Sequence, residues 1–173
     1  MQSGSINTSI LYERLMKTFR WGNISDPSVF IDSNTYRTTL ILQLRRRFTD
    51  LAAALVAEGK TDQARLVADR ITGLLPVANF RNDVSIPGLA EIYYQVGVPD
   101  KGNSLLRGYL TEMEQDLRYI ISVEKEIGSV LSNEAEQNIT LLGEISRLAE
   151  AYNQMGLVEE VQKLIEKLQI NPL

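Results

Sequence analysis

The sequence of 173 residues contains no cysteine and no histidine. Without cysteine the chain can form neither disulfides nor thiolate metal sites, and it offers no thiol nucleophile. Without histidine it lacks the side chain that most often acts as a general acid or base near neutral pH. Catalysis would therefore depend on a carboxylate, lysine, tyrosine or serine with a perturbed pKa, and no spacing of these residues indicates such a group.

Long hydrophobic runs are also absent. No apolar stretch reaches the roughly 18 residues that a membrane-spanning helix needs, and the N-terminus lacks the basic-then-apolar order of a signal peptide. We therefore expect that this segment does not span a membrane. Hydrophobic residues make up 44% and charged residues 23%, which is typical of a chain that folds around a core.

The charge of the chain is unevenly distributed. Its net charge is −4, but residues 1–60 hold 8 Lys and Arg against 5 Asp and Glu, whereas residues 61–173 hold 10 against 17. Nucleic-acid binding requires a basic surface that displaces counterions from phosphates. The acidic majority therefore excludes nucleic acid as an expected partner.

Three windows of the sequence, residues 51–59, 89–97 and 148–156, align with one another without gaps. Each begins with Leu and Ala, carries a large residue three positions after the Ala, and ends in Gly, which favours the left-handed conformation at a helix end. Apolar residues recur 5, 9 and 12 positions beyond two of these glycines: Ala64, Ala68 and Ile71 after Gly59, and Val161, Ile165 and Leu168 after Gly156. This pattern predicts helical hairpins that reverse at each Gly.

The hairpin at Gly59 resembles a tetratricopeptide repeat from its early aromatic residue, Phe48, to its closing Pro76. The second hairpin is divergent, with Gly102 in the position of the family's small Ala, and the third has Val161 there. The three glycines are 38 and 59 residues apart, whereas a regular array repeats every 34 or so. The sequence therefore predicts an all-α fold, an irregular tetratricopeptide-like αα-hairpin array with hairpins at about 34–76, 86–131 and 134–170.

The excess length between the second and third repeats is explained by an overlong helix from about 103 to 131, followed by a helix that begins near Ser132. The first 33 residues differ in character, with a short helix at about 10–19 and a turn that contains Trp21. Asp32, Ser33 or Asn34 can cap the next helix. We predict two parts, an N-terminal capping segment at 1–33 and a helical-repeat domain at 34–173.

Motifs for cofactors are weak in this sequence. Residues 58–61 carry the end of a phosphate-binding loop, but Ala54 replaces a required Gly, so we interpret Gly59 as a helix C-cap. Acidic clusters such as Glu112, Glu114 and Asp116 diverge on a helix and have no histidine to join them. We expect no cofactor and no metal site.

Five residues are candidates for contact with a partner. Adjacent arginines on a helix point about 100° apart, so the run at 45–47 is first interpreted as solvated or ion-paired, with a partner or anionic headgroups as the alternative. Tyrosines on the first helices of repeats belong to the core or line a groove. The candidate partner-binding residues are Tyr94, Asn153, Arg45, Arg46 and Trp21.

A second resemblance covers nearly the whole chain and is strongest over residues 11–76. It rests on residues 11–22, 26–32, the Arg-rich helix that runs into Leu51 and Ala52, and residues 58–60. These segments resemble the soluble C-terminal tail of a family of large bacterial multi-pass membrane proteins, whose membrane domain is similar to protein O-mannosyltransferases and other GT-C glycosyltransferases. The resemblance implies a membrane domain ahead of residue 1, which would hold the catalytic residues, and a tail on the periplasmic side.

Three functions follow as hypotheses. The first is a non-catalytic accessory domain of such a glycosyltransferase-like membrane protein, which supports that membrane domain or recruits a protein partner to it. The alternative is a free-standing cytoplasmic adaptor that binds a peptide or protein, and the third is a small enzyme with an unrecognised carboxylate. A tail predicts exposed apolar surface in the N-terminal third, an adaptor predicts a groove lined by Tyr94 and Asn153, and an enzyme predicts an enclosed pocket with several acids.

Overall fold

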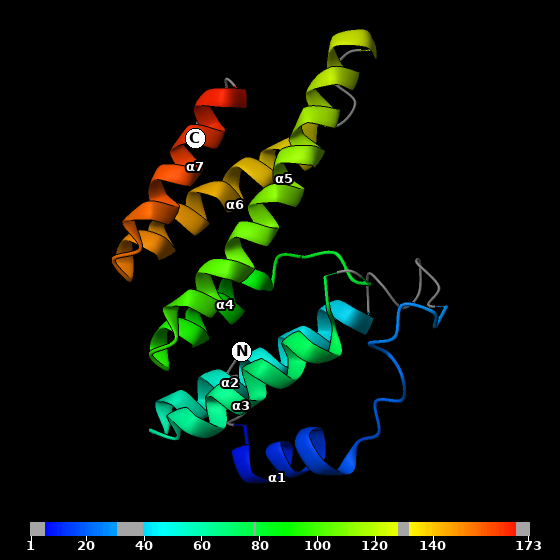
Figure 1. The fold of residues 1–173 in the computed structure, drawn as a ribbon, viewed down its shortest axis with the longest axis vertical. Coiled ribbons are helices and arrows are strands. Elements are labelled where there is room, and N and C mark those ends of the chain that lie inside the picture. Colours follow the sequence, from blue (N-terminus) through cyan, green and yellow to red (C-terminus); the bar gives the residue numbers. More distant parts are fainter. Residues whose placement is uncertain (1–5, 31–39, 78, 128–131, 169–173) are drawn as a thin grey trace. The chain divides into compact units, whose positions relative to one another are not determined.

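The computed structural model describes residues 6–30, 40–77, 79–127 and 132–168, and every regular element within these ranges is a helix (Figure 1). The predicted all-α fold is therefore confirmed. The short N-terminal elements are α1 (Thr8–Glu13) and the π-helical η1 (Arg14–Thr18). The others are α2 (Leu42–Ala57), α3 (Thr61–Leu74), α4 (Ile86–Gln95), α5 (Pro99–Ile127), α6 (Ser132–Ala151) and α7 (Met155–Leu168).

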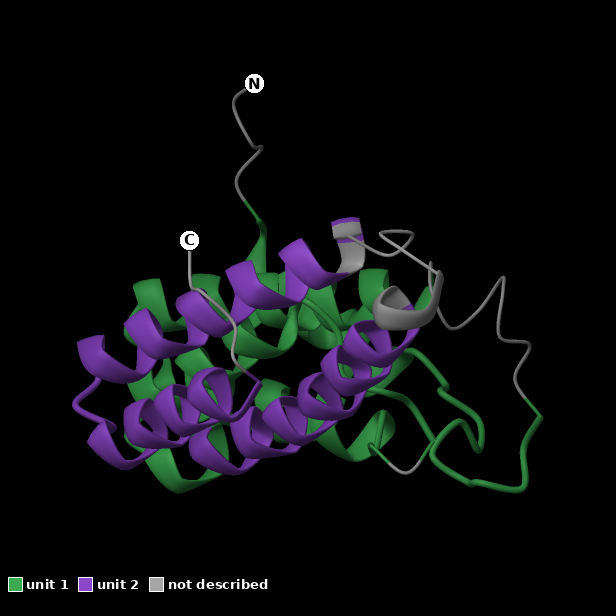
Figure 2. Ribbon diagram, turned by 90° about the horizontal axis from the view of Figure 1, so that it is seen from above, with its two compact units in different colours: residues 1–102 green, residues 103–173 purple. Residues whose placement is uncertain are grey.

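The chain forms two compact units, residues 1–102 and residues 103–173, which Figure 2 distinguishes by colour. The division falls just inside α5, whereas the two parts predicted from the sequence meet at residue 33. The predicted boundary at residue 33 is based on sequence motifs alone and stays a prediction. The residues expected to cap the helix after it, Asp32, Ser33 and Asn34, lie outside the described residues.

In the first unit, α2 and α3 form a helical hairpin because the chain reverses at Gly59. Gly59 has a φ of +74°, and the amides of Gly59 and Lys60 donate to the carbonyls of Val56 (2.9 Å) and Leu55 (2.8 Å). This is the paired hydrogen bonding of a helix end that closes on a left-handed residue. The helices meet through side chains that are at most 1% exposed: Phe48, Leu51, Ala52, Leu55, Ala64, Ala68 and Ile71.

The sequence predicts this hairpin at about 34–76; α2 and α3 span residues 42–74, and residues 34–39 lie outside the described residues. Full burial of one leucine side chain stabilises a fold by about 1.5–3 kcal/mol, so this apolar seam is the main source of stability in the hairpin. The interval between the first two predicted hairpins, residues 76–86, corresponds to the connection between α3, which ends at Leu74, and α4, which begins at Ile86.

Helix α4 packs on both α2 and α3 and ends at a second reversal of the same kind. Gly97 has a φ of +76°, and the amide of Val98 donates to the carbonyl of Tyr93 at 2.8 Å. Gly102, five residues further on, approaches α4 closely. A Cβ on Gly102 would lie 2.7 Å from the ring of Tyr94 and 3.0 Å from the carbonyl oxygen of Ala90. The close contact therefore requires Gly at this position, where the pattern of the family has the small Ala.

The third reversal lies at a different residue from the predicted one. Helix α6 ends at Ala151, Asn153 has a φ of +57°, and the amide of Gln154 donates to the carbonyl of Ala149 at 2.7 Å. Gly156, which was predicted to end this helix, lies inside α7. The prediction is wrong by three residues, because a slip of almost one helical turn preserves the apolar pattern and because Asn also tolerates the left-handed conformation.

The slip also changes which residues of α7 are buried. In the first hairpin the small Ala64 lies five residues after the turn residue Gly59. Five residues after the turn residue Asn153 comes Val158, which is 4% exposed, and not Val161. Ile165 and Leu168, predicted on the buried stripe, are only partly covered. The buried residues of α7 are Leu157, Val158, Val161 and Leu164.

The second unit contains α5 from residue 103 together with α6 and α7. With 29 residues, α5 is the overlong helix that the sequence predicts. Polar contacts join it to α7: the guanidinium of Arg107 is 2.9 Å from Glu160, and the ammonium of Lys167 is 2.8 Å from Glu114. The hydrogen bonds from Lys167 and Arg118 lower the pKa of Glu114. These exposed ion pairs link α7 to α5 but contribute little to stability.

Alanine at Gly102 should destabilise the chain, although alanine normally stabilises a helix interior. We expect Gly102→Ala to lower the free energy of unfolding by about 1–3 kcal/mol, because the added methyl overpacks the contact with Tyr94. Gly73→Ala is the matched control, since a Cβ there meets nothing within 4 Å, and it should be neutral or stabilising by up to about 1 kcal/mol. Urea denaturation of the two variants measures the difference, and equal effects would contradict the close contact.

Candidate functional site

The N-terminal helix is fastened to the first hairpin by a polar contact. The hydroxyl of Thr8, which is 5% exposed, donates to the carboxylate of Glu58 at the end of α2, at 2.9 and 3.0 Å from its two oxygens. Lys60 forms an ion pair with the same carboxylate at 2.6 Å. Hydrogen bonds from Lys60 and then Thr8 lower the pKa of Glu58. Because the carboxylate is favoured in the folded state, this contact is kept above the ordinary pKa of Glu and lost as the pH falls through the lowered one.

Trp21 holds the other end of the same segment. Its indole N–H donates to the carbonyl of Leu15 at 3.2 Å, and its ring lies 5.7 Å from that of Phe48 and 5.8 Å from that of Phe19. Leu15 itself is buried at 4% exposure. The sequence places Trp21 among the partner-binding candidates, but the structure shows it half-buried against α2, where it anchors the segment.

An exposed and partly apolar surface is formed by α1, η1 and Phe19, the residue that follows them. Ile10 is 54% and Phe19 48% exposed, and both line an open groove of about 590 Å³. We call this groove, with Lys17 beside it, the N-terminal face; its lining residues are Ser9, Ile10, Glu13, Arg14, Thr18 and Phe19. Lys17 forms an ion pair with Glu13 at 2.9 Å. The face combines two large apolar side chains with cationic groups.

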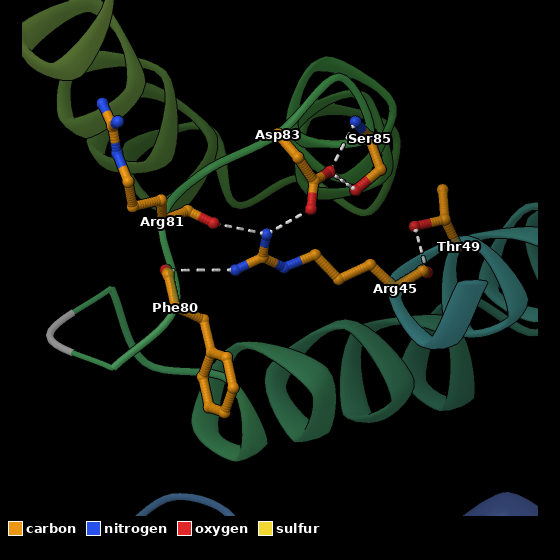
Figure 3. A network of polar contacts seen from close by, with 6 residues as sticks. All are labelled: Arg45, Thr49, Phe80, Arg81, Asp83 and Ser85. Carbon is orange, nitrogen blue, oxygen red and sulfur yellow. Dashed lines mark hydrogen bonds and ion pairs between the residues drawn. The ribbon is translucent and has the colours of Figure 1, made fainter. Parts of the chain in front are cut away.

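Arg45 occupies the interior of the first unit (Figure 3). It is 3% exposed, and its guanidinium forms an ion pair with Asp83 and donates to the carbonyls of Arg81 (2.8 Å) and Phe80 (3.4 Å). Asp83 also accepts from the amide of Ser85 at 2.9 Å, just before α4 begins. Arg45 therefore holds the loop that leads into α4 and is not offered to a partner, which corrects its place among the candidate residues.

The other arginines of the run point elsewhere, as the helical geometry predicts. Arg46 is exposed, and Arg47 is 3.6 Å from Asp50. The three guanidinium groups therefore do not form one binding site. Arg46 remains available on the surface of α2.

The remaining candidates, Tyr94 and Asn153, are in different environments. Tyr94 is 7% exposed and lies against the start of α5 at Gly102, so its side chain belongs to the core. Asn153 is exposed in the turn between α6 and α7, where its positive φ gives it a role in the backbone. The structure thus explains both residues by packing and turn geometry.

One polar network was missed by sequence reasoning. The hydroxyl of Tyr93 donates to Asp69 at 2.9 Å and lies 3.1 Å from the hydroxyl of Thr72, while Lys101 reaches the same Asp69 oxygen at 2.5 Å. Burial, with Asp69 adding to it, raises the pKa of Tyr93, so its phenol stays protonated. The residues of this network come from α3, α4 and α5, and no sequence spacing links residues 69, 93 and 101. The network joins these helices and is a structural contact.

Two further observations concern metals and membranes. The part of the chain that the structure describes contains no group of three or more Asp and Glu side chains placed to hold a metal ion. Among the same residues, no helix is both long enough and apolar enough to cross a bilayer.

Comparison of the chain with protein-family models, with curated proteins and with solved structures found no match.

Replacing the buried arginine should destabilise the first unit much more than replacing its exposed neighbour. Arg45→Met removes the ion-pair partner of Asp83 and the donor to two carbonyls, which should lower the free energy of unfolding by roughly 3 kcal/mol. Arg46→Ala, on the same helix, should change it by less than about 0.5 kcal/mol. Urea denaturation followed by the fluorescence of Trp21, the chain's single tryptophan, measures both. Similar losses in the two variants would show that the network is not needed.

Proposed function

We propose that this chain is a non-catalytic, tetratricopeptide-like helical accessory domain of a glycosyltransferase-like membrane protein, which packs on that protein or recruits a partner to it. The observation that carries the proposal is the N-terminal face, where Ile10 and Phe19 remain about half exposed on a segment whose inner side is anchored. Large apolar side chains that share one open groove favour a contact surface. The position of the face, in the N-terminal third, agrees with what the membrane-protein resemblance implies.

The adaptor hypothesis has less support from the geometry. It requires a peptide groove lined by first-helix residues such as Tyr94, but that ring is 7% exposed and its edge packs against Gly102. A peptide cannot reach it without displacing the start of α5. Asn153 alone, exposed in a turn, does not make a groove.

The non-catalytic part of the proposal rests on the chemistry of the groups that are present. The sequence has neither His nor Cys. The titratable cluster around Tyr93 and Asp69 uses its hydrogen bonds within the fold, and burial keeps the phenol protonated. The reaction of the proposed parent protein would accordingly be carried out by its membrane domain, with this domain on the periplasmic side.

Mapping the gene that encodes this segment and fractionating its full-length product tests the proposed function. We expect the reading frame to continue upstream of residue 1 through many apolar spans, and the product to sediment with membranes and to resist alkaline extraction. A frame that starts at Met1, with a product that stays in the supernatant, would contradict the proposal and favour the free-standing adaptor.

A further inference from the structure

The centre of the N-terminal face is apolar and accessible. Ile10 and Phe19 come from the start of α1 and the residue after η1, and both line the same open groove. Their neighbours Thr8 and Leu15 are 5% and 4% exposed, so the segment is buried on the side that meets the first hairpin while Ile10 and Phe19 stay accessible. Side chains of this size, when they enter the boundary between headgroups and acyl chains, supply the apolar part of interfacial binding.

The charges around this apolar centre are predominantly positive. Residues 6–21 contain Arg14, Lys17 and Arg20 but one acid, Glu13, which gives this segment a charge of +2 in a chain whose net charge is −4. Arg14 lines the groove, and Glu13 forms an ion pair with Lys17. Among the described residues, Arg14 and Arg20 have no ion-pair partner, and both are exposed. An unpaired cation, Arg14, is thus available at the apolar groove.

Anionic lipid headgroups match this combination of charge and apolarity. Exposed Lys and Arg beside a membrane are attracted to the negative surface potential of acidic lipids, and neighbouring apolar side chains enter the interface. The anchoring of Trp21 and Thr8 on the inner side fixes the orientation of the segment. The face can therefore meet a flat surface without unfolding from the first hairpin.

We propose that the N-terminal face rests on an anionic bilayer surface, with Ile10 and Phe19 entering the interface and Arg14, which lines the groove, contacting a lipid phosphate. This inference rests on the proposed function, which places a membrane beside the domain, and it names lipid as what the face contacts there. The domain would then be oriented on the membrane by its own residues in addition to its covalent connection to the parent chain.

Co-sedimentation of the 173-residue chain with vesicles tests this inference. We expect binding to vesicles of phosphatidylcholine mixed with phosphatidylglycerol, weaker binding to phosphatidylcholine alone, and weakening by salt. The variant Arg14→Ala should lose roughly fivefold in partition coefficient on the anionic vesicles. The double variant Ile10→Ser, Phe19→Ser should lose roughly tenfold.

The control variants remove comparable groups elsewhere. Leu66→Ser changes an apolar side chain of α3 that is 53% exposed, and Arg147→Ala removes an exposed cation of α6; neither should alter vesicle binding. Circular dichroism verifies that all variants keep their helices.

Equal binding to neutral and anionic vesicles, or equal losses in the test and control variants, would overturn the lipid proposal. Absence of vesicle binding, with binding of the detergent-purified parent protein through Ile10 and Phe19, would overturn it in favour of a protein contact and leave the proposed function standing. The proposed function fails by a different result, a full-length product that does not sediment with membranes.

Discussion

The fold depends on left-handed residues that end helices and turn the chain back on itself. Gly59, Gly97 and Asn153 each have a positive φ, and each is followed by a new helix within a few residues. Such a turn fixes which faces of two successive helices meet, and so it decides which residues must be small. The contact of Gly102 with the ring of Tyr94 follows directly from the reversal at Gly97.

The candidate surface is a consequence of how one short segment is attached. Trp21 packs on Phe48, and Thr8 bonds to Glu58, so the inner side of α1 and η1 is held by the first hairpin. A helix this short is only marginally stable in water by itself, and its exposed apolar side chains would otherwise have no fixed arrangement. Attachment presents Ile10 as part of a defined surface.

Much of the fold is predictable from the sequence, since helical periodicity and Gly59 define the first hairpin. The third reversal was misplaced because a slip of about one turn leaves the apolar pattern intact, and Asn153 then replaces Gly156 as the turn residue. Arg45 follows Ile41 by four residues and precedes Phe48 by three, so it lies on the apolar stripe of α2. Its burial was not predicted because a charged side chain is usually expected to be exposed. The exposed N-terminal face could be anticipated only as a region, because which apolar side chains stay uncovered depends on packing.

Site-specific photo-crosslinking in the full-length protein tests the central claim, that the N-terminal face is the docking surface of this domain, most directly. A photoreactive amino acid at the position of Ile10, in native membranes, should form crosslinks to the parent membrane domain or to lipid, whereas the same amino acid at the position of Leu66 should not. Crosslinks from the position of Leu66 with none from that of Ile10 would show that another surface docks and would contradict the account.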